Sequence, residues 1–330
     1  MLLGASVELW QQQFIRALFH YSPEHLDIER AFLVKHPHVP ARLYKYRQFT
    51  EYHLDALKKD VLWLSSPDRL NDPYEAQVSF DVDRFKVEDQ SVDHFLAEAR
   101  RARQAIEAGE DWRPTEPSRP INAGDWRRQM VSTILQSSDL SKKEAFASIV
   151  EEWSKEQAQA HVRSMSQQFR KGFSVLSLSA TANSKLLWAH YSNSHKGFAI
   201  EYDFASLPYG DLRRRLCFPV FYTTKLRDAT RYFDKPGKPF NNLFGQYMCL
   251  VKQDDWAYEK EWRIVQAIGP EHANCEMRMP KPAAVILGSQ VSHSDEETMR
   301  QMCKERSVTL KRMVQKPGTF QLEPVQVALD

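Results

Sequence analysis

The feature that most constrains the fold is a succession of short apolar segments in the second half of the chain. Each segment has four to eight residues, and most contain β-branched or aromatic residues with polar residues between them. Segments of this length and composition are typical of β-strands. We therefore expect strands at residues 173–179, 197–204, 217–223, 261–268, 276–279, 283–289, 308–314 and 320–325.

Helical patterns precede and interrupt these strands. Apolar residues at helical spacing predict helices within residues 1–40, and a strand–helix–strand unit follows at 43–64. From about 83 to 170 the pattern is again helical. The expected fold class is α+β, with one mixed or mostly antiparallel sheet. Residues 1–40 are expected to form a helical preface, and residues 41–330 a single domain with a helical insertion at about 83–170.

Polar residues mark where several helices are expected to begin. Thr50 is a typical N-cap for a helix over residues 51–60. Ser22-Pro23 predicts a second helix in the preface, because proline suits the first helical position. A capping-box pattern at 294–297 predicts the start of a helix that ends at Arg306.

The composition excludes several classes of protein. Only 11 of the 330 residues are glycine, which leaves little material for a glycine-rich phosphate-binding loop. The 45 Lys and Arg residues nearly balance the 43 Asp and Glu residues, so the net charge is only +2. A charged ligand must therefore be bound by a local cluster and not by the field of the whole molecule.

The apolar runs and the cysteines indicate the compartment. No run approaches the ~18 consecutive apolar residues of a transmembrane helix, and the first residues lack the pattern of a signal peptide. The four cysteines are scattered without a C-x-x-C pair, so neither a zinc site nor a disulfide framework is indicated. We expect a cytoplasmic protein with reduced thiols and no membrane contact.

The segment at 258–264, YEKEWRI, has the most distinctive arrangement of charges. Alternate residues of a strand share a face, so Glu259, Glu261 and Arg263 are expected on one side. Two carboxylates this close repel each other, which raises the pKa of at least one of them unless cations intervene. Arg263 and Lys260 are the candidate cations, and a salt-bridged edge strand is the simpler alternative.

Two further strands carry polar side chains that could bind a ligand. Ser177 and Ser179 share one face of their strand, although such serines commonly face water. Tyr44 lies on one face of the first predicted strand, and Lys45 and Arg47 lie on the other. The planar guanidinium of Arg47 is suited to a diphosphate, unless it is only an exposed strand end.

Two other segments offer ligand-binding side chains. Trp188, His190 and Tyr191 fall on a predicted helix over 184–192. They could form a stacking surface for a planar ring such as nicotinamide or a base, although aromatic residues at helical spacing more often belong to the core. The polar segment at 71–75 could bind a metal ion, but an Asx-turn explains it without one.

Five segments, taken in order, form a recognisable set. They are LYKYR (43–47), WLSSPDRLNDPYE (63–75), LSLSATANSKLLWAHYSNSHKGFAIEYDF (176–204), WAYEKEWRIV (256–265) and AAVILGS (283–289). In this order they resemble bacterial domain-of-unknown-function family 2971. The resemblance covers roughly residues 43–290 without the helical insertion, and the family name implies no activity.

The order of three shorter motifs carries a second resemblance. Arg47 comes first, Ser177-Leu178-Ser179 follows, and Glu259-Lys260-Glu261 comes last. This order resembles ADP-ribosyltransferases of the arginine–serine–glutamate type, which carry a basic residue on the first strand, Ser-x-Ser on a second and Glu-x-Glu on a later one. The resemblance implies an ADP-ribosyltransferase-like fold and an enzyme that consumes NAD as its substrate, with no metal.

The same resemblance implies a role for each matching residue. Glu261 is the catalytic carboxylate, which binds the ribose 2′-hydroxyl and stabilises the oxocarbenium-like state, and Glu259 is its partner. The residues implied to bind NAD are Arg47 or Lys45 at the phosphates, Ser177 and Ser179 at the nicotinamide ribose, and Trp188 or Tyr191 at the ring, with Tyr44 and His190 beside them.

Three functions stay open at this stage. The leading expectation is an NAD-consuming ADP-ribosyltransferase-like enzyme, such as a bacterial toxin or an anti-phage defence effector, that modifies a protein or nucleic-acid acceptor. The second is a metal-dependent nuclease with Mg²⁺ held by Asp72, Glu75, Glu259 and Glu261. The third is a non-enzymatic sensor or partner-binding domain, in which the helices at about 83–170 dock another protein.

Overall fold

The computed structural model describes residues 7–81, 170–233, 241–267 and 275–329, with scattered positions between 159 and 167 and residue 239. Most of the helical insertion predicted at about 83–170 lies outside the described residues. The chain divides into two compact units, and every strand of the main sheet belongs to the larger one. The larger unit consists of Met1–Ser79, Ser166–Arg227 and Pro239–Asp330, and the smaller of Phe80–Met165 and Asp228–Lys238.

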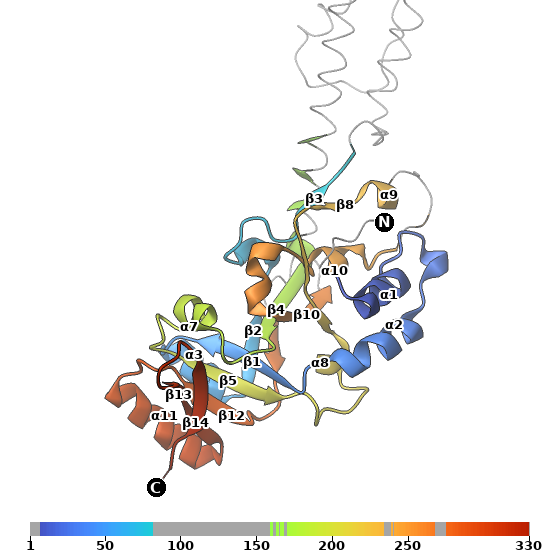
Figure 1. Cartoon of the computed structure of the whole chain (residues 1–330). Helices are drawn as coiled ribbons and strands as arrows, with labels where there is room; N and C mark the ends of the chain where they lie inside the picture. The colour runs from blue at the N-terminus through green and yellow to red at the C-terminus, as the bar shows by residue number, and fades with distance from the viewer. Residues whose placement is uncertain are drawn as a thin grey trace, which may run out of the picture. The chain divides into compact units, whose positions relative to one another are not determined.

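Eight strands form one mostly antiparallel sheet in the order β14-β13-β12-β5-β1-β4-β10-β6 (Figure 1). β12 and β13 are parallel, and every other neighbouring pair is antiparallel. The predicted α+β class with a mostly antiparallel sheet is therefore confirmed. These strands are β1 (Arg42–Arg47), β4 (Phe173–Ser179), β5 (Phe198–Asp203), β6 (Cys217–Pro219), β10 (Glu261–Ala267), β12 (Ala284–Leu287), β13 (Thr309–Gln315) and β14 (Leu322–Gln326).

The other described elements are short strands and helices. β2 (Val61–Leu64) pairs with β11 (Cys275–Arg278), and β7 (Phe221–Thr223) pairs with β9 (Val251–Gln253). The strand predicted at 217–223 is thus two strands, because β6 pairs with β10 and β7 with β9. The remaining strands are β3 (Val78–Ser79) and β8 (Arg227–Asp228). The α-helices are α1 (Leu9–Leu18), α2 (Ile28–Lys35), α3 (Glu51–Lys58), α7 (Lys185–Tyr191), α8 (Leu212–Arg215), α9 (Thr230–Phe233), α10 (Phe244–Met248) and α11 (His293–Arg306). The 3₁₀-helices are Pro23–His25, His36–His38, Pro67–Arg69 and Asp254–Glu259.

Two of the three predicted helix starts are displaced. Thr50 caps α3 as expected, because its side chain accepts a hydrogen bond from the first turn. Ser22-Pro23 begins only a 3₁₀ turn, and α2 starts later, where the carboxylate of Asp27 caps it. The capping box predicted at 294–297 already lies inside α11, because Ser292 provides the N-cap two residues earlier.

The sheet has an apolar face and a partly polar face, and β4 and β10 show the difference most clearly. Leu176 and Leu178 of β4 pair with Ile264 and Trp262 of β10, and all four are buried in the main core. The alternate residues of the same two strands point to the other side, as the period of two requires. Those residues are Ser177, Ser179, Glu261 and Arg263.

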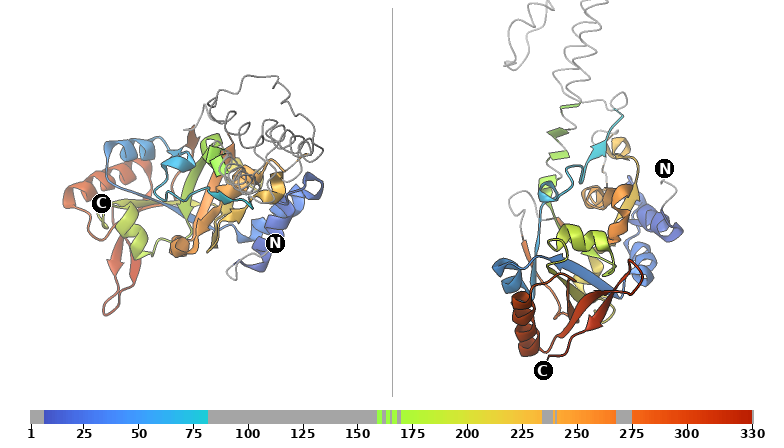
Figure 2. Two further views of the ribbon diagram at one scale, coloured as in Figure 1. Left: turned by 90° about the horizontal axis from the view of Figure 1, so that it is seen from above. Right: turned by 60° about the vertical axis from the view of Figure 1, so that its left-hand side comes forward.

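The helical preface lies at the β6 end of the sheet, and α11 lies toward the β13 end (Figure 1). Figure 2 shows the same separation from two further sides. A buried lysine fastens the preface, because Lys35 Nζ of α2 donates to the carbonyl oxygens of Arg214, Arg215 and Cys217. Its ammonium group therefore satisfies carbonyls at the end of α8, where a helix attracts positive charge.

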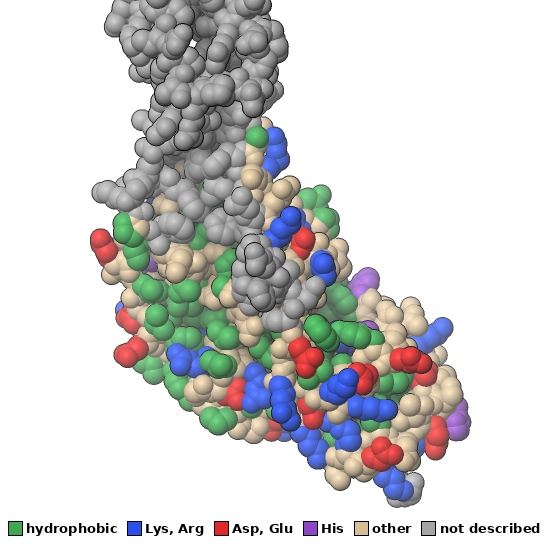
Figure 3. All heavy atoms as spheres, turned by 180° about the vertical axis from the view of Figure 1, so that it is seen from behind, with side chains coloured by type: hydrophobic (Ala, Val, Ile, Leu, Met, Phe, Trp, Pro, Cys, Tyr) green, Lys and Arg blue, Asp and Glu red, His purple; other side chains and the backbone are tan. Residues whose placement is uncertain are grey.

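The surface of the described residues carries charges of both signs. On the face in Figure 3, Lys and Arg side chains are interspersed with Asp and Glu side chains. This arrangement agrees with the small net charge of +2. None of the described helices combines the length and the apolar character that crossing a membrane requires.

Two of the few glycines lie where the backbone approaches another segment too closely for a side chain. A Cβ atom on Gly197 would lie 2.1 Å from the carbonyl oxygen of Arg47, at the end of β1. A Cβ atom on Gly288 would lie 2.0 Å from the carbonyl oxygen of His195. The loop before β5 therefore packs against the ends of β1 and β12 through these two positions.

Replacing Gly197 by alanine tests this contact. Gly197→Ala should lower the free energy of unfolding by about 1–3 kcal/mol, because the strand end or the loop must move to accept the methyl group. Gly210→Ala is the matched control, since nothing lies within 4 Å of the added Cβ atom. Urea unfolding followed by circular dichroism measures both, and equal stability of the two variants would contradict the close approach.

Candidate functional site

The site lies where β1 and β4 meet. β1 pairs with β5 along its whole length, from Arg42 to Arg47, but it pairs with β4 only at Tyr44 and Ser179. β4 in turn pairs with all of β10. The sheet is thus joined by a single residue pair at its centre, and the side chains on either side of this join line a pocket.

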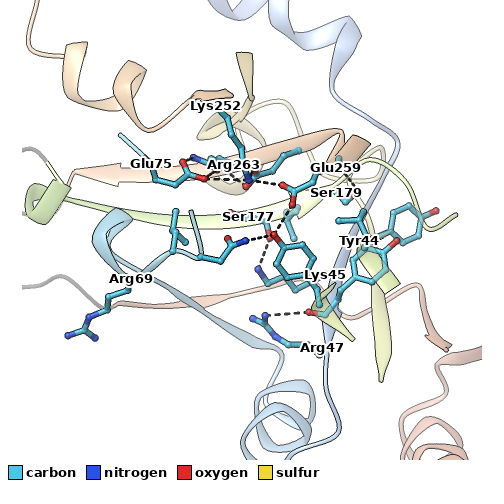
Figure 4. Close-up of a pocket in the computed structure, with 17 residues that line it drawn as sticks. Tyr44, Lys45, Arg47, Arg69, Glu75, Ser177, Ser179, Lys252, Glu259 and Arg263 are labelled. Carbon is cyan, nitrogen blue, oxygen red and sulfur yellow. Dashed lines mark hydrogen bonds and ion pairs between the residues drawn. The ribbon is translucent and has the colours of Figure 1, made fainter. Parts of the chain in front are cut away.

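The pocket has a volume of about 270 Å³ and is lined from β1, β4, β9, β10, α7, the 3₁₀-helix Asp254–Glu259 and the segment at 69–75. Eight of the ten residues that the sequence predicted for the site line it, namely Tyr44, Lys45, Arg47, Ser177, Ser179, Tyr191, Glu259 and Glu261. Figure 4 shows Glu75, Arg263, Lys252 and Glu259 following one another along one side, with Lys45 and Arg47 across from them.

The other two predicted residues, Trp188 and His190, do not line this pocket. Trp188 is fully buried, packs edge-on against Tyr46 and donates its indole N–H to the carbonyl oxygen of Ala182 at 2.7 Å. His190 is exposed on the helix surface. Residues four apart share a helix face, so α7 turns Leu187 and Tyr191 toward the pocket and these two residues away from it.

A buried arginine organises the acidic side of the pocket. Arg263 Nε and Nη2 donate to the two carboxylate oxygens of Glu261, each at 2.8 Å. Arg263 Nη1 and Nη2 donate to the two oxygens of Glu75, each at 2.7 Å, and Nη1 also donates to the carbonyl oxygen of Cys249. Arg263 is 1% exposed, so these charge-assisted bonds are shielded from water.

The second glutamate of the site has different partners. Glu259 Oε2 accepts a hydrogen bond from Lys252 Nζ at 2.7 Å, and its Oε1 accepts one from the hydroxyl of Tyr191, also at 2.7 Å. The Tyr191 hydroxyl accepts in turn from the amide of Asn71 at 2.9 Å. This chain of bonds connects α7 and the segment at 69–75 to the carboxylate.

The pKa values of the two glutamates are therefore shifted in opposite directions. Burial alone would raise the pKa of Glu261, but Arg263, Lys252 and a hydrogen bond from Ser177 together lower that pKa to about 2. Burial and repulsion by Glu261 raise the pKa of Glu259, and Lys252 and Tyr191 oppose this only in part. Glu261 is thus held as a carboxylate, whereas Glu259 binds a proton more readily than an exposed glutamate.

The backbone between the two glutamates is turned and held. Lys260 adopts a left-handed conformation with φ of 46°, between the 3₁₀-helix that ends at Glu259 and the start of β10. Ser179 Oγ donates to the carbonyl oxygen of Glu259 at 2.7 Å. Ser179 thus anchors this turn, while the hydroxyl of Ser177 helps to lower the pKa of Glu261.

The opposite side of the pocket is basic. Lys45 Nζ donates to the carbonyl oxygen of Ser177 at 2.7 Å, and burial together with the neighbouring Arg47 lowers the pKa of this lysine well below its usual value. Arg47 Nη1 lies 3.5 Å from the carbonyl oxygen of Tyr46. Within the described residues, neither Lys45 nor Arg47 forms an ion pair with a carboxylate, so the guanidinium of Arg47 is available to an anionic ligand.

The acidic residues proposed above as Mg²⁺ ligands have other partners. The carboxylates of Glu75, Glu259 and Glu261 surround the cationic groups of Lys252 and Arg263. Asp72 accepts from the backbone N–H of Tyr74, which makes the Asx-turn. Across the described ranges, no group of three or more His, Cys, Asp or Glu side chains is placed to hold a metal ion.

Lys252 is the residue of the site that the sequence did not identify. It lies on the short strand β9, 7 residues before Glu259, and belongs to none of the motifs. The only signal in the sequence is a lysine that directly follows the apolar pair Leu250-Val251. The sequence indicates Glu75 only as a metal ligand. Its pairing with Arg263 could not be predicted, because the two residues are 188 positions apart.

Comparison with known proteins finds a family match over part of the chain. Residues 187–264 match the family described as Protein of unknown function (DUF2971). The match extends from α7 into β10 and includes Tyr191, Lys252, Glu259 and Glu261. No curated protein and no solved structure matches the chain. This supports the resemblance to the family of unknown function and assigns no activity.

The opposite environments of the two glutamates predict opposite effects of neutral substitutions. Glu261→Gln should lower the free energy of unfolding at pH 7 by about 2–4 kcal/mol, because it removes a charge that Arg263 and Lys252 neutralise. Glu259→Gln should change it by less than about 1 kcal/mol, since burial already disfavours that charge. Urea unfolding of both variants is the measurement, and equal losses would refute the assignment.

The effect of Glu261 should also depend on pH. Its pKa in the folded protein, about 2, lies below the usual 4.5, so the unfolded chain binds more protons between these values. The stabilisation is complete above pH 4.5 and is lost as the pH falls toward 2. The difference in unfolding free energy between wild type and Glu261→Gln should therefore shrink below pH 4.5. A difference that is constant with pH would contradict the low pKa.

Proposed function

We propose that this chain is an NAD-consuming enzyme of the ADP-ribosyltransferase type. One observation carries the proposal: the basic residue lies on β1, the Ser-x-Ser motif on β4 and the Glu-x-Glu motif at the start of β10, with Glu259 just before that strand, and all three line one pocket. Arg47 and Ser177 are 130 residues apart in sequence, and their convergence on one pocket supports the proposal.

The distribution of charge in the pocket suits oxidised NAD. Glu75, Glu259 and Glu261 carry three negative charges, and Lys252 and Arg263 carry two positive ones, which leaves one negative charge on this side. The guanidinium of Arg47 lies across the pocket, beside Lys45 (Figure 4). NAD has a cationic nicotinamide ring and an anionic diphosphate, so its two ends match the two sides.

The size of the pocket also suits part of this ligand. Its volume of about 270 Å³ lies just below the ~300–1,000 Å³ typical of sites for whole drug-sized ligands, so it suits only part of a dinucleotide. We propose that the nicotinamide riboside enters the pocket, while the diphosphate reaches Arg47 and the adenosine stays outside. Side chains, and not a glycine-rich loop, then bind the phosphates.

In the proposed reaction Glu261 accepts a hydrogen bond from the 2′-hydroxyl of the nicotinamide ribose. Its fixed negative charge stabilises the positive charge that develops on the ribose as the C1′–N bond breaks and its electron pair leaves with nicotinamide. The acceptor, water or a nucleophilic group of another molecule, then forms a bond to C1′. Its proton passes to Glu259, and the two products are nicotinamide and ADP-ribose joined to the acceptor.

The same geometry bears on the alternative of a non-enzymatic sensor. That hypothesis predicts that no cleft contains Ser179, His190 and Glu261 together. Ser179 and Glu261 line the same pocket, whereas His190 does not, and the helices assigned to partner binding lie outside the described residues. The position of His190 outside the pocket agrees with the sensor hypothesis, whereas the shared position of Ser179 and Glu261 supports the proposed enzyme. As a toxin or defence effector, it would act by depleting NAD or by modifying an acceptor in the cytoplasm.

The release of nicotinamide from NAD tests the proposal. Purified protein, with cell lysate supplied as the source of acceptors, should release nicotinamide, and Glu261→Gln should lower the rate by at least ~100-fold. Arg47→Ala should raise the KM for NAD by about 10–100-fold, because it removes a charge-assisted bond to phosphate. NADH, whose ring is uncharged, should not be cleaved.

Glu201→Gln is the matched control for Glu261→Gln. Glu201 is a buried glutamate of the same sheet, ion-paired with Lys311 at 2.8 Å, but it does not line the pocket. The control should keep the wild-type rate. Arg47→Ala separates activity from folding, since no carboxylate among the described residues loses its partner. The proposal fails if folded protein releases no nicotinamide, or if Glu261→Gln and Glu201→Gln are equally active.

A further inference from the structure

Lys252 contacts three carboxylates, although it belongs to none of the three motifs. Its Nζ lies 2.7 Å from Glu259 Oε2, 3.2 Å from Glu261 Oε2 and 3.4 Å from Glu75 Oε1. Lys252 is 5% exposed, and its ammonium group also lies 4.8 Å from the centre of the Trp256 ring. The group is therefore held in one position by contacts on several sides.

Two of these carboxylates do not depend on Lys252. Arg263 donates an N–H group to each of the two oxygens of Glu75 and to each of the two oxygens of Glu261. Both glutamates therefore keep a cationic partner and a fixed orientation if Lys252 is removed. The contacts of Lys252 with them only add to an arrangement that Arg263 already completes.

Glu259 is in a different position. Within the described part of the chain, Lys252 is the only cation within 4 Å of its carboxylate, and its other side-chain donor is the neutral hydroxyl of Tyr191. Burial and the charge of Glu261 both favour the protonated form of this glutamate. The titratable groups that influence Glu259 are Glu261 of β10, Lys252 of β9, Tyr222 of β7, Lys45 of β1, Tyr191 of α7 and the adjacent Tyr258.

We propose that Lys252 is a positioning residue that keeps Glu259 ionised and turned toward the pocket, while Arg263 does the same for Glu261. Each glutamate of the Glu-x-Glu motif thus has its own cationic partner. The catalytic consequence rests on the proposed function, because an ionised Glu259 is the form that can take the proton of the acceptor. Lys252 acts through Glu259 and has no chemical step of its own.

Carboxyl titration by NMR tests this division without any need for turnover. The protein carries ¹³C-labelled glutamate side chains, and Glu259→Gln and Glu261→Gln assign the two resonances. Lys252→Met should raise the pKa of Glu259 by about 1–3 units and that of Glu261 by less than half as much. Lys252→Arg should restore the wild-type titration of Glu259, because it restores the charge.

Lys311→Met is the matched control. Lys311 pairs with Glu201 at 2.8 Å in the same sheet but outside the pocket, so its removal should leave both titrations unchanged. Equal shifts of Glu259 and Glu261 in Lys252→Met, or no shift of Glu259, would overturn the proposal.

The titration and the turnover assay can fail separately. If nicotinamide is released, Lys252→Met should move the pH profile of kcat by the same amount as the titration of Glu259, and Lys252→Arg should restore it. If no nicotinamide is released but Glu259 titrates as expected, the proposed function is wrong and the role of Lys252 stands. If nicotinamide is released but only the pKa of Glu261 shifts, the proposed function stands and the role assigned to Lys252 is wrong.

A second pair of variants decides the case if Lys252→Met does not fold. Adding Glu259→Gln to Lys252→Met should then restore folding, because it removes the glutamate that has lost its cation. Adding Glu261→Gln should not restore folding, since Glu261 keeps Arg263 as its partner. Rescue by Glu261→Gln and not by Glu259→Gln would overturn the proposal as clearly as the titration.

Discussion

The interaction on which the site depends is the buried guanidinium of Arg263. This one side chain binds Glu261 on its own strand, Glu75 in the segment at 69–75 and the carbonyl oxygen of Cys249. Its five donors in a rigid plane allow it to bind both carboxylates through paired bonds at the same time. Burying a charge in this way costs free energy of folding unless every partner is present. The three segments are therefore held together by the charge and hydrogen-bond partners that they provide for Arg263.

This arrangement gives the pocket its polarity. With Arg263 committed to Glu75 and Glu261, only Lys252 is left to balance Glu259, and one net negative charge stays on that side. Arg47 of β1 lies across the pocket, where it is not paired with a carboxylate of the described residues. A ligand with positive charge at one end and negative charge at the other is therefore favoured over one that is uniformly charged. The proposed binding of NAD follows from this polarity.

The scarcity of glycine in the chain is consistent with such a site. Glycine is used where backbones nearly touch, as at Gly197 and Gly288, and not in a phosphate-binding loop of the described residues. Gly197 lies against the carbonyl oxygen of Arg47, so the close approach positions the strand end that carries the guanidinium. Anion binding by side chains requires this kind of support, because a flexible arginine must be held near the position of the ligand.

The sequence by itself determined which residues of β4 and β10 share a face, because the alternation of a strand is a local property of the backbone. Ser177, Ser179, Glu261 and Arg263 could therefore be predicted to act together once their strands were recognised. The sequence could not determine that α7 turns Tyr191 and not Trp188 toward the pocket, since this depends on how the helix packs against the sheet. Nor could it pair Arg263 with Glu75 across 188 residues, because only the tertiary structure decides which distant charges are buried together.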